Sequence, residues 1–331
     1  MTVLIGIDVS KQKLDVAWLR DPETLKVKTR VFPNTRSGCQ DVVAWLSKVT
    51  GEVAGNMRVM MEATGIYHED LAYTLHEAGL QVHVANPQHA HQFAQSLGKR
   101  SKTDKKDSIV LARFLHSRPH QRWEPEAEEI RVLKALLSRL QALETDLLRE
   151  NNRLEKASIR RSSDEVQRSI EKMIGALEAE RDRLRQQIDD HFDDHPGLKS
   201  DRELLKSIPG IGNVLATELT ATLRSRQFRS AGQAAAFVGL VPIMSESGDS
   251  AYKRPTLSKA GASRLRAKLY MGAVVAIRHN ALVRRHYERL VGRGKAKMSA
   301  LGAAMRKLVQ MAYGVLKHQR GYDPQWVQGT A

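Results

Sequence analysis

The sequence lacks several features that define well-known classes of protein. It has one cysteine, Cys39, in 331 residues, which excludes an internal disulfide and any metal site built from several cysteines. No apolar run reaches the ~18 residues that a membrane-spanning helix needs, and the first residues are typical of a strand and not of a signal peptide. We therefore expect a cytoplasmic protein that acts without a membrane partner.

Acidic residues are scarce in the last quarter of the chain. Positions 251–331 contain 17 Lys and Arg but two Asp and Glu, a net charge of +15, whereas the whole chain carries +16. Such a concentration is typical of a surface that binds a polyanion, because neutralising phosphates releases condensed counterions. A merely solvated basic tail is the alternative. However, Leu301, Met305 and Leu308 have helical spacing, so we expect a folded segment that binds nucleic acid.

The remaining composition is ordinary for a globular protein, with 41% hydrophobic and 27% charged residues. Over about the first 120 residues, short apolar runs alternate with segments of helical spacing, which predicts an α/β domain. We expect strands at 3–8, 14–19, 26–32, 58–61 and 81–85, and helices at 41–48 and 68–79.

Two long segments then carry apolar seams. Leucines from Leu133 to Leu154 recur at spacings of three, four and seven, and a second seam runs from Ile174 to Ile188. This pattern predicts two long helices that pair as a coiled coil or hairpin. The rest of the chain is expected to be mainly helical, with a Ser- and Gly-rich interruption at 245–250. We therefore divide the chain into domains at 1–122, 123–197 and 198–331.

Four carboxylates stand out by their positions. Asp8 and Glu62 end two apolar runs, while Asp104 and Asp107 are three residues apart at the start of an expected helix and so share a face. Such residues can gather into an all-oxygen pocket suited to Mg²⁺ or Mn²⁺, and two such ions stabilise both oxygens of a phosphodiester displacement. The alternative is that Asp104 caps the helix and the others are surface charges.

Basic residues surround this segment and follow a second motif. Lys102, Lys105 and Lys106 provide a rim suited to phosphate, although a charge run is often only a solvated face. The sequence Ile208-Pro209-Gly210-Ile211-Gly212 before an apolar helix is typical of a helix–hairpin–helix element. There, Gly210 and Gly212 would let backbone amides approach a phosphate; an ordinary turn between helices is the alternative.

A serine-rich stretch precedes most of the C-terminal cations. Ser245, Ser247 and Ser250 are candidate nucleophiles only if a base or metal activates one of them, and composition does not choose among the three. A simple loop is the alternative. The basic residues that could hold nucleic acid here are Lys253, Arg254, Lys259, Arg264, Arg266 and Lys268.

Six short motifs follow one another along the chain. They are Ile5-Gly6-Ile7-Asp8, Met61-Glu62-Ala63-Thr64-Gly65, Asn86-Pro87, Lys102-Thr103-Asp104-Lys105-Lys106-Asp107, Ile208-Pro209-Gly210-Ile211-Gly212 and Ser258-Lys259-Ala260-Gly261. Their order and separations resemble those of the DEDD transposases of the insertion-sequence family numbered one hundred and ten, relatives of the Piv-type invertases. The resemblance covers nearly the whole chain, and the ordered set is specific although each motif is weak.

This resemblance implies a fold and a metal site. The family has a RuvC-like (RNase H-like) α/β domain, then a coiled coil, then a mainly helical C-terminal transposase domain that contains the helix–hairpin–helix-like element. Asp8, Glu62, Asp104 and Asp107 match the family's tetrad for Mg²⁺ or Mn²⁺.

The resemblance also implies a nucleophile. The family's serine lies in a Glu-Ser-Gly motif, which here is Glu246-Ser247-Gly248 and selects Ser247. In the family this serine attacks DNA and forms a covalent phosphoserine intermediate. Asp249 follows the motif and departs from it: it either assists the metal, deprotonates Ser247 or faces away.

The resemblance further implies partners. Family members are guided by a structured bridge RNA that pairs with donor and target DNA, and they act as tetramers with sites shared between subunits. A protein whose sequence choice is delegated to RNA needs mainly backbone contacts, which a basic C-terminal segment suits. We expect a homo-oligomer, a dimer that assembles to a tetramer, on chromosomal or plasmid DNA.

The predicted function is therefore that of a transposase or site-specific recombinase that moves its own insertion sequence through a Ser247–DNA bond. Two alternatives remain open. One is a RuvC-like endonuclease that uses metal-activated water and no serine, and the other is a non-enzymatic scaffold that binds nucleic acid.

Overall fold

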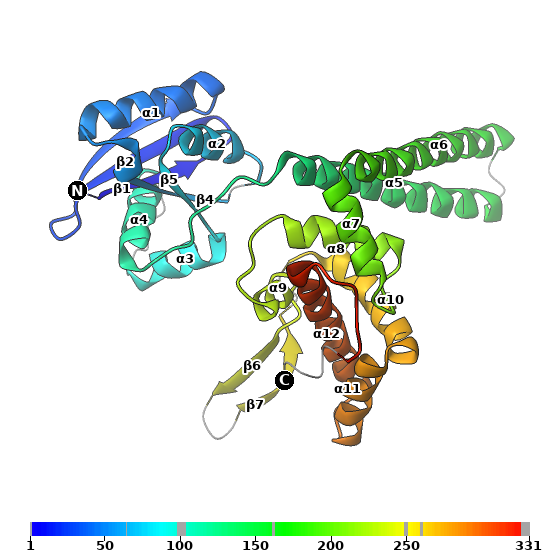
Figure 1. Cartoon of the computed structure of the whole chain (residues 1–331). Helices are drawn as coiled ribbons and strands as arrows, with labels where there is room; N and C mark the ends of the chain where they lie inside the picture. The colour runs from blue at the N-terminus through cyan, green and yellow to red at the C-terminus, as the bar shows by residue number, and fades with distance from the viewer. Residues whose placement is uncertain are drawn as a thin grey trace. The chain divides into compact units, whose positions relative to one another are not determined.

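The structure is a computed structural model of the chain, and it describes residues 2–63, 65–97, 104–160, 163–247, 251–258 and 261–325. For residues 104–106, 244–247 and 251–256 it describes the backbone alone. The chain divides into two compact units, Met1–Pro125 and Glu126–Ala331, which are considered separately (Figure 1). No helix within the described ranges is both long and apolar enough to cross a membrane.

The first unit contains a five-stranded mixed sheet in the order β3-β2-β1-β4-β5 (Figure 1). The first three strands form an antiparallel meander, while β4 and β5 run parallel to β1. Every residue of β1 except Asp8 is buried, which explains why this central strand is a continuous apolar run. All five predicted strands are confirmed, as β1 (Val3–Val9), β2 (Lys13–Asp21), β3 (Lys26–Pro33), β4 (Met57–Glu62) and β5 (Gln81–Ala85).

Helices cover both faces of this sheet. The predicted helices α1 (Arg36–Thr50) and α2 (Glu69–Glu77) pack on one face, and the short 3₁₀ turn η1 (Ala54–Asn56) precedes β4. The other face is covered by α3 (Pro87–Ser96) and α4 (Asp104–Ser117). Side chains alternate along a strand, so the odd-numbered residues of β1 face α1 and α2, and the even-numbered residues face α4.

The helix α4 touches β1 at Gly6. A Cβ atom at Gly6 would lie 2.0 Å from the carbonyl oxygen of Ser108 and 2.4 Å from the amide nitrogen of Ala112. No side chain fits in that space, so glycine is required for the helix to rest directly on the backbone of the strand. This contact fixes the position of α4 relative to the end of β1.

The segment that follows α4 is held against the edge strand β5. The backbone amide of Trp123 donates to the carbonyl of Val82 at 2.7 Å. The ring of Trp123 meets Tyr73 of α2 edge-on, with 5.2 Å between ring centroids. This segment therefore covers an edge that would otherwise present unpaired backbone groups.

The second unit begins with two long antiparallel helices, α5 (Glu128–Ile159) and α6 (Asp164–Asp194), which pack against each other as predicted (Figure 1). The hydroxyl of Ser163 caps α6 by accepting from the amide of Val166. The elements that follow are α7 (Pro196–Lys206), α8 (Asn213–Arg224), α9 (Ala231–Phe237), β6 (Pro242–Ser247), β7 (Ala251–Leu257), α10 (Ser263–His279), α11 (Ala281–Gly292) and α12 (Lys297–His318).

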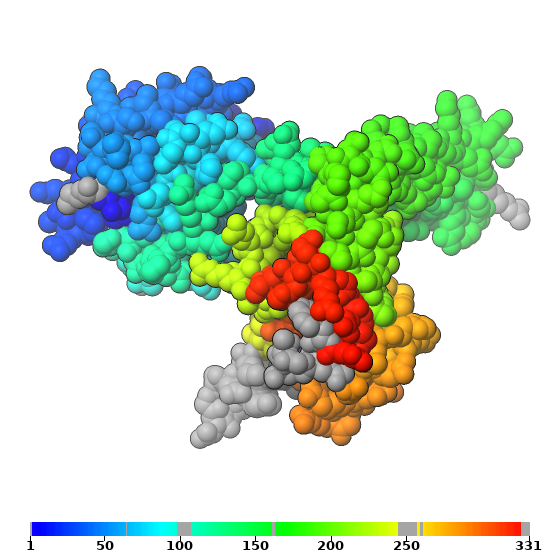
Figure 2. Space-filling view, viewed as in Figure 1, coloured from blue at the N-terminus to red at the C-terminus, as the bar shows by residue number. Residues whose placement is uncertain are grey.

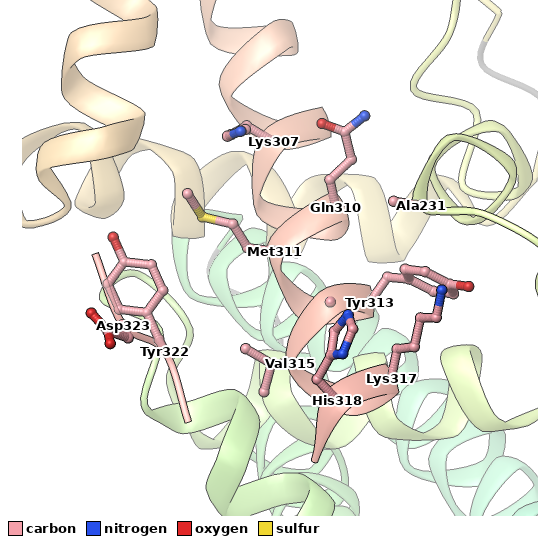
Figure 3. A pocket seen from close by; sticks show the side chains of 11 residues that line it. Ala231, Lys307, Gln310, Met311, Tyr313, Val315, Lys317, His318, Tyr322 and Asp323 are labelled. Atoms are coloured by element: carbon pink, nitrogen blue, oxygen red, sulfur yellow. The ribbon is translucent and has the colours of Figure 1, made fainter. Parts of the chain in front are cut away.

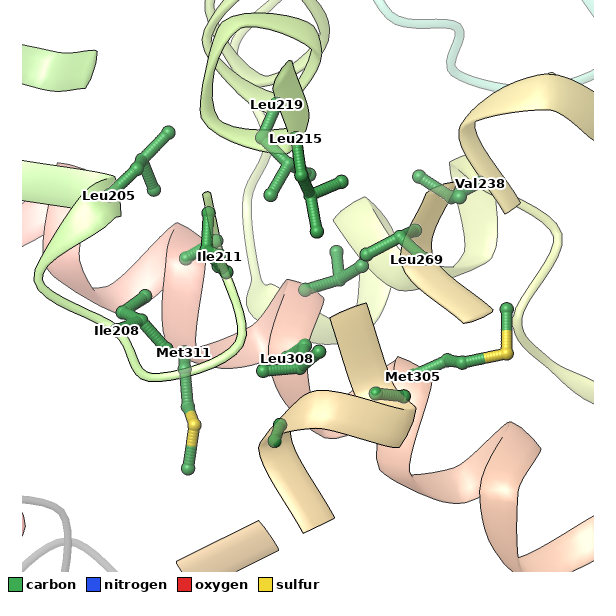
Figure 4. Packing of buried hydrophobic residues seen from close by; sticks show 14 of the residues in the cluster. Leu205, Ile208, Ile211, Leu215, Leu219, Val238, Leu269, Met305, Leu308 and Met311 are labelled. Atoms are coloured by element: carbon green, nitrogen blue, oxygen red, sulfur yellow. The ribbon is translucent and has the colours of Figure 1, made fainter. Parts of the chain in front are cut away.

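The core of the second unit surrounds α12. This helix contributes Met305, Leu308 and Met311 to an apolar cluster (Figure 4). Ile208 and Leu269 belong to the same cluster, on the loop after α7 and on α10. Eleven of the helix's residues are buried, so α12 is a core helix and not an amphipathic surface helix.

One local prediction differs from the structure. The Ser- and Gly-rich stretch at 245–250 was expected to be a loop within a helical domain, but β6 and β7 form an antiparallel hairpin around it, in which Ser247 pairs with Ala251. The flanking segments do not alternate regularly between apolar and polar residues, so the usual signal of a half-buried strand is absent.

Candidate active site

Asp8 and Glu62 are brought together at one edge of the sheet. The parallel register between β1 and β4 pairs Ile7 with Met61, and the next residues along the two strands are Asp8 and Glu62. Both are partly buried and both alternate onto the face that α4 covers. The carboxyl ends of two parallel neighbours thus place two carboxylates side by side, as the sequence predicted.

The direction of α4 brings its first turn to the same edge. From Ser108, which lies over Gly6, the helix continues to Leu111 and Leu115, which share an apolar cluster with Leu4. Because Leu4 precedes Gly6, α4 runs antiparallel to β1 and its start lies toward the carboxyl end of that strand.

Measured from the contact at Gly6, the distances along α4 to Asp104 and along β1 to Asp8 agree. Asp104 precedes Ser108 by four residues, or ~6 Å of helix, and Asp8 follows Gly6 by two residues, or ~6.6 Å of strand. The backbone of Asp104 is therefore level with Asp8. Asp107, one residue before Ser108, is partly buried in the same first turn.

A fifth carboxylate, which the sequence analysis missed, lies beside this group. Asp15 of β2 is directly opposite Asp8 in the antiparallel register and is only 7% exposed. Its Oδ2 lies 3.2 Å from the ammonium of Lys13. In β2, Lys13, Asp15 and Leu19 alternate onto the α4 face, a pattern that would have indicated Asp15 once the pairing of β1 with β2 was known.

The donors at this edge suit a hard divalent cation, because carboxylate oxygens are the ligands that Mg²⁺ and Mn²⁺ prefer. Among the side chains that the structure describes, no group of three His, Cys, Asp or Glu is placed to hold a metal ion. The side chain of Asp104 lies outside the part of the chain that the structure describes.

Ser247 is the last residue of β6 and lies next to the tip of the hairpin. The structure describes its backbone alone, and Gly248 and Asp249 lie outside the described residues. The position is at the end of a strand, and Figure 1 shows the β6–β7 hairpin projecting from the helices of the second unit.

Cys39 is not an alternative nucleophile. It lies in the first turn of α1 and is fully buried, and burial, with a smaller contribution from Asp70, raises the pKa of its thiol to about 11. A thiol with this pKa is protonated at neutral pH, and the protonated form is a poor nucleophile.

The loop between α7 and α8 is anchored by its isoleucines, since Ile208 and Ile211 lie in the core (Figure 4). Gly210 has a φ of +106°, and a Cβ there would lie 2.6 Å from Cβ of Ala276, so close packing on α10 explains this glycine. Gly212 is exposed, has open space around it and precedes α8 without a side-chain cap. That the backbone amides at Gly210 and Gly212 face a phosphate stays a prediction.

Several predicted nucleic-acid-binding cations have partners within the second unit. Arg266 donates to the carbonyls of Val238 at 3.2 Å and Gly261 at 3.0 Å, and Lys268 forms an ion pair with Glu218. Arg264 donates to the hydroxyl of Thr145 at 3.3 Å. Arg266 thus supports a backbone turn whether or not nucleic acid is present.

The side chains of the other predicted cations are not among those that the structure describes. Lys105 and Lys106 lie in the first turn of α4, and Lys253 and Arg254 lie in β7, with only the backbone described. Lys102 and Lys259 lie outside the described residues. Their proposed contacts with nucleic acid remain predictions.

Comparison with known proteins matches both units. A family model described as "Transposase" matches residues 5–157, and a second, described as "Transposase IS116/IS110/IS902 family", matches residues 202–288. The first match contains Asp8, Glu62, Asp104 and Asp107, and the second contains the hairpin with Ser247.

The chain also has full-length relatives. It is 30% identical to the pilin gene-inverting proteins of Moraxella bovis and Moraxella lacunata over 323 residues, which is 96% of this chain and 97% of each relative. It is 27% identical to a probable family 20 transposase of Pseudomonas aeruginosa over 303 residues, 80% of this chain and 86% of that protein.

A sheet edge that carries carboxylates, a strongly basic C-terminal region and these matches define the class: the chain is a DNA transposase or recombinase. It belongs to the IS116/IS110/IS902 family of transposases. The resemblance found in its sequence motifs is thereby confirmed.

Proposed function

We propose that this enzyme cuts and rejoins DNA at the ends of its own insertion sequence and at a target, through a covalent bond between Ser247 and DNA. The observation that carries the proposal is the meeting of Asp8, Glu62 and the first turn of α4 at one edge of the sheet. Carboxylates gathered in this way are suited to phosphoryl transfer.

The first unit is proposed to be a RuvC-like, RNase H-like domain. Its order β3-β2-β1-β4-β5, with an antiparallel meander followed by two parallel strands, supports this assignment, as do acidic residues at the ends of β1 and β4. We retain the three-domain division at 1–122, 123–197 and 198–331, with the paired helices α5 and α6 as a coiled coil, as part of the proposal.

Asp8, Glu62, Asp104 and Asp107 would hold Mg²⁺ or Mn²⁺. A bound divalent cation supplies Lewis-acid stabilisation of the charge that develops on phosphate oxygens. The chain's own contribution is to hold the carboxylates in place through the strand register and the contact of α4 with Gly6.

The proposed covalent step exchanges one ester bond to phosphorus for another. The Oγ of Ser247 loses its proton to a base and forms a bond to phosphorus, while the bond from phosphorus to one deoxyribose oxygen breaks and that oxygen takes up a proton. A hydroxyl end of another strand reverses the step and releases the serine. The energy of the phosphodiester is kept in the phosphoserine ester, so rejoining needs no ATP.

The proposed partners are DNA, a structured bridge RNA and further copies of the chain. The net charge of +15 over residues 251–331 supports binding of nucleic acid. Two relatives are named for inverting a pilin gene, which requires strands to be cut and rejoined at two places, and this supports the same chemistry here. We propose a dimer that assembles to a tetramer.

A plasmid assay tests this function. Supercoiled DNA carrying the element ends and target is incubated with the protein, Mg²⁺ and RNA transcribed from the flank of the element. We expect wild type and Ser245→Ala, a control on the same strand, to give recombinant product, and Asp8→Asn and Ser247→Ala to give none. Cleavage retained by Ser247→Ala would indicate a water-using nuclease, and full activity of Asp8→Asn would exclude the carboxylate site.

A further inference from the structure

A cavity of about 470 Å³ lies along α12, outside the proposed active site. It extends from Ala231 at the start of α9, across α12, to Tyr322 and Asp323 in the segment that follows the helix (Figure 3). Met311 and Val315 line its apolar part, and Lys307 and Lys317 carry positive charge into it. The end of α12 and the segment after it reach the surface of the second unit (Figure 2).

A glycine near the C-terminal end of α12 lines this cavity. Gly314 lines it, is only partly buried, and has no atom within 4 Å of the place where a Cβ would lie. Glycine is disfavoured in a helix interior, and here neither packing nor a positive φ requires it. An uncovered helix backbone instead lets a ligand approach closely.

Positive charge continues from Lys307 toward α11. The pKa of His286 on α11 is lowered, first by burial and then by the nearby charges of Arg289, Lys307 and Lys295. A second cavity of about 370 Å³ is lined by Leu290, Arg293, Gly294 and Lys295. Lys307, Lys295 and Arg289 thus all lie close enough to His286 for their charges to act on it.

The acidic residue that lines the first cavity does not reverse its sign. Asp323 has a carboxylate oxygen 3.6 Å from the guanidinium of Arg320 and accepts from the backbone amide of Gln325 at 2.8 Å. Two lysines therefore line the cavity, and its one carboxylate has an arginine beside it.

We propose that this groove on α12, lined by Lys307, Gly314 and Lys317, binds a phosphodiester strand of nucleic acid. The proposal rests on the function proposed above and adds a binding site to it. Lys307 and Lys317 are ten residues apart, or ~15 Å along the helix, which equals about four nucleotides at ~3.4 Å per nucleotide. Tyr313 and Tyr322 offer rings beside which a base can stack.

The charge contribution is tested by the salt dependence of binding. Fluorescence anisotropy measures the affinity of the full chain for duplex DNA, single-stranded DNA and a structured RNA of equal length. In a plot of the logarithm of the binding constant against the logarithm of the salt concentration, each phosphate contact contributes a slope of about −0.9 for duplex and −0.7 for single strands. One contact therefore changes the affinity roughly fivefold to eightfold between 1 M and 0.1 M salt. For the probe that occupies the groove, we expect the double variant Lys307→Ala, Lys317→Ala to bind more weakly than wild type, with a salt dependence reduced by about two such contacts.

Lys172→Ala is the matched control for charge, because Lys172 is exposed on α6. The Lys172→Ala variant is expected to bind each of the three probes as tightly as wild type does. Lys317 also lies in the last turn of α12, where a cation favours the helix dipole, so the melting temperature of each variant is measured as well. An unchanged affinity and slope for all three probes in the double variant overturns the proposal.

The shape contribution is tested by filling the groove. Gly314→Gln is expected to weaken binding of the same probe by roughly the factor of one lost phosphate contact. Gly175→Gln on α6 is the control, because Gly175 is also a glycine within a helix with open space around it. Equal binding by the two glutamine variants overturns the proposal.

The outcomes separate this site from the proposed function. If wild type binds none of the three nucleic acids, the proposed function fails together with the groove. If wild type binds and recombines DNA but the groove variants bind as wild type does, only the groove is wrong.

Discussion

Asp15 of β2 lies directly opposite Asp8 of β1, and both carboxylates face the side of the sheet that α4 covers. Asp15 is 7% exposed and forms an ion pair with Lys13 at 3.2 Å. The edge that carries the candidate tetrad therefore has an additional negative charge close to its first member. Replacing a residue that orients a metal ligand typically lowers metal affinity or activity by about 10- to 100-fold.

Replacing Asp15 should weaken metal binding. We expect Asp15→Asn to reduce the affinity for Mn²⁺ by about 10- to 100-fold, the usual effect of losing a group that orients a ligand, because the variant removes a buried carboxylate charge directly opposite Asp8. Calorimetry with Mn²⁺ measures this. Asp21→Asn, at the exposed end of the same strand, is the control, and equal affinities for the two variants would contradict the account.

Adding a single methyl group at Gly6 should displace α4. Gly6→Ala places a Cβ 2.0 Å from the carbonyl oxygen of Ser108, and backbone atoms cannot yield cheaply. We expect the free energy of unfolding to fall by about 1–3 kcal/mol and recombination to be lost, because the first turn of α4 moves away from Asp8. Urea unfolding measures the first effect. Gly55→Ala, which has open space, should change neither quantity.

Acid should destabilise the first unit through His83. This side chain is 4% exposed, its Nδ1 lies 3.0 Å from the carbonyl oxygen of Gln121, and its Nε2 has no hydrogen-bond partner among the residues that the structure describes. Burial lowers its pKa from 6.5, and the charges of Arg58, Arg122 and His120 add to this.

The sign of the effect follows from that shift. A histidine with a lowered pKa stabilises the fold fully above pH 6.5, and this contribution is lost as the pH falls below that value. His83→Asn should therefore be less sensitive than wild type to a change from pH 7.5 to pH 5, measured by urea unfolding. Equal pH dependence of the two proteins would show that His83 is not responsible.

Asp201 is expected to be essential for the fold of the second unit. It is 2% exposed and accepts from Arg224 at 2.5 and 2.7 Å and from Gln319 at 2.8 Å, which joins α7, α8 and the end of α12. Asp201→Ala should cost about 1.5–3 kcal/mol of unfolding free energy, because it removes charge-assisted hydrogen bonds to a buried carboxylate, while the Arg224 side chain, 40% exposed, keeps its contact with water.

The neighbouring ion pair on the same helix provides the comparison. Glu203 and Lys206 of α7 are exposed, and pairs of this kind contribute about 0–1 kcal/mol. Glu203→Ala should therefore unfold at nearly the urea concentration of wild type. A similar loss in both variants would mean that burial of Asp201 is not what makes it important.

Much of the first unit could be predicted because its signals are local. The apolar runs of β1 and β5 end at polar residues, and Gly79, with a φ of +85°, follows α2 as a C-terminal glycine typically does. In contrast, α3 was not predicted. Its sequence has few apolar residues, and Ala90 is the residue that it buries within the described part of the chain.

The candidate site was only partly predictable for a different reason. Asp8 and Glu62 could be found because each ends a strand, but the place of Asp15 depends on which residue of β2 faces Asp8, and no local spacing encodes that register. Likewise, no local spacing indicates that Gly210 packs closely on Ala276 of α10, a neighbour 66 positions away in sequence.

The central claim is that Ser247 forms a covalent bond with DNA, and trapping that bond tests it most directly. Protein, Mg²⁺, flanking RNA and DNA labelled at the element ends are mixed, denatured, separated on a gel and digested for peptide mapping. We predict a DNA adduct on the peptide that contains Ser247, which is present with Ser245→Ala and absent with Ser247→Ala. Cleaved DNA without any adduct, or an adduct that persists in Ser247→Ala, would contradict the account.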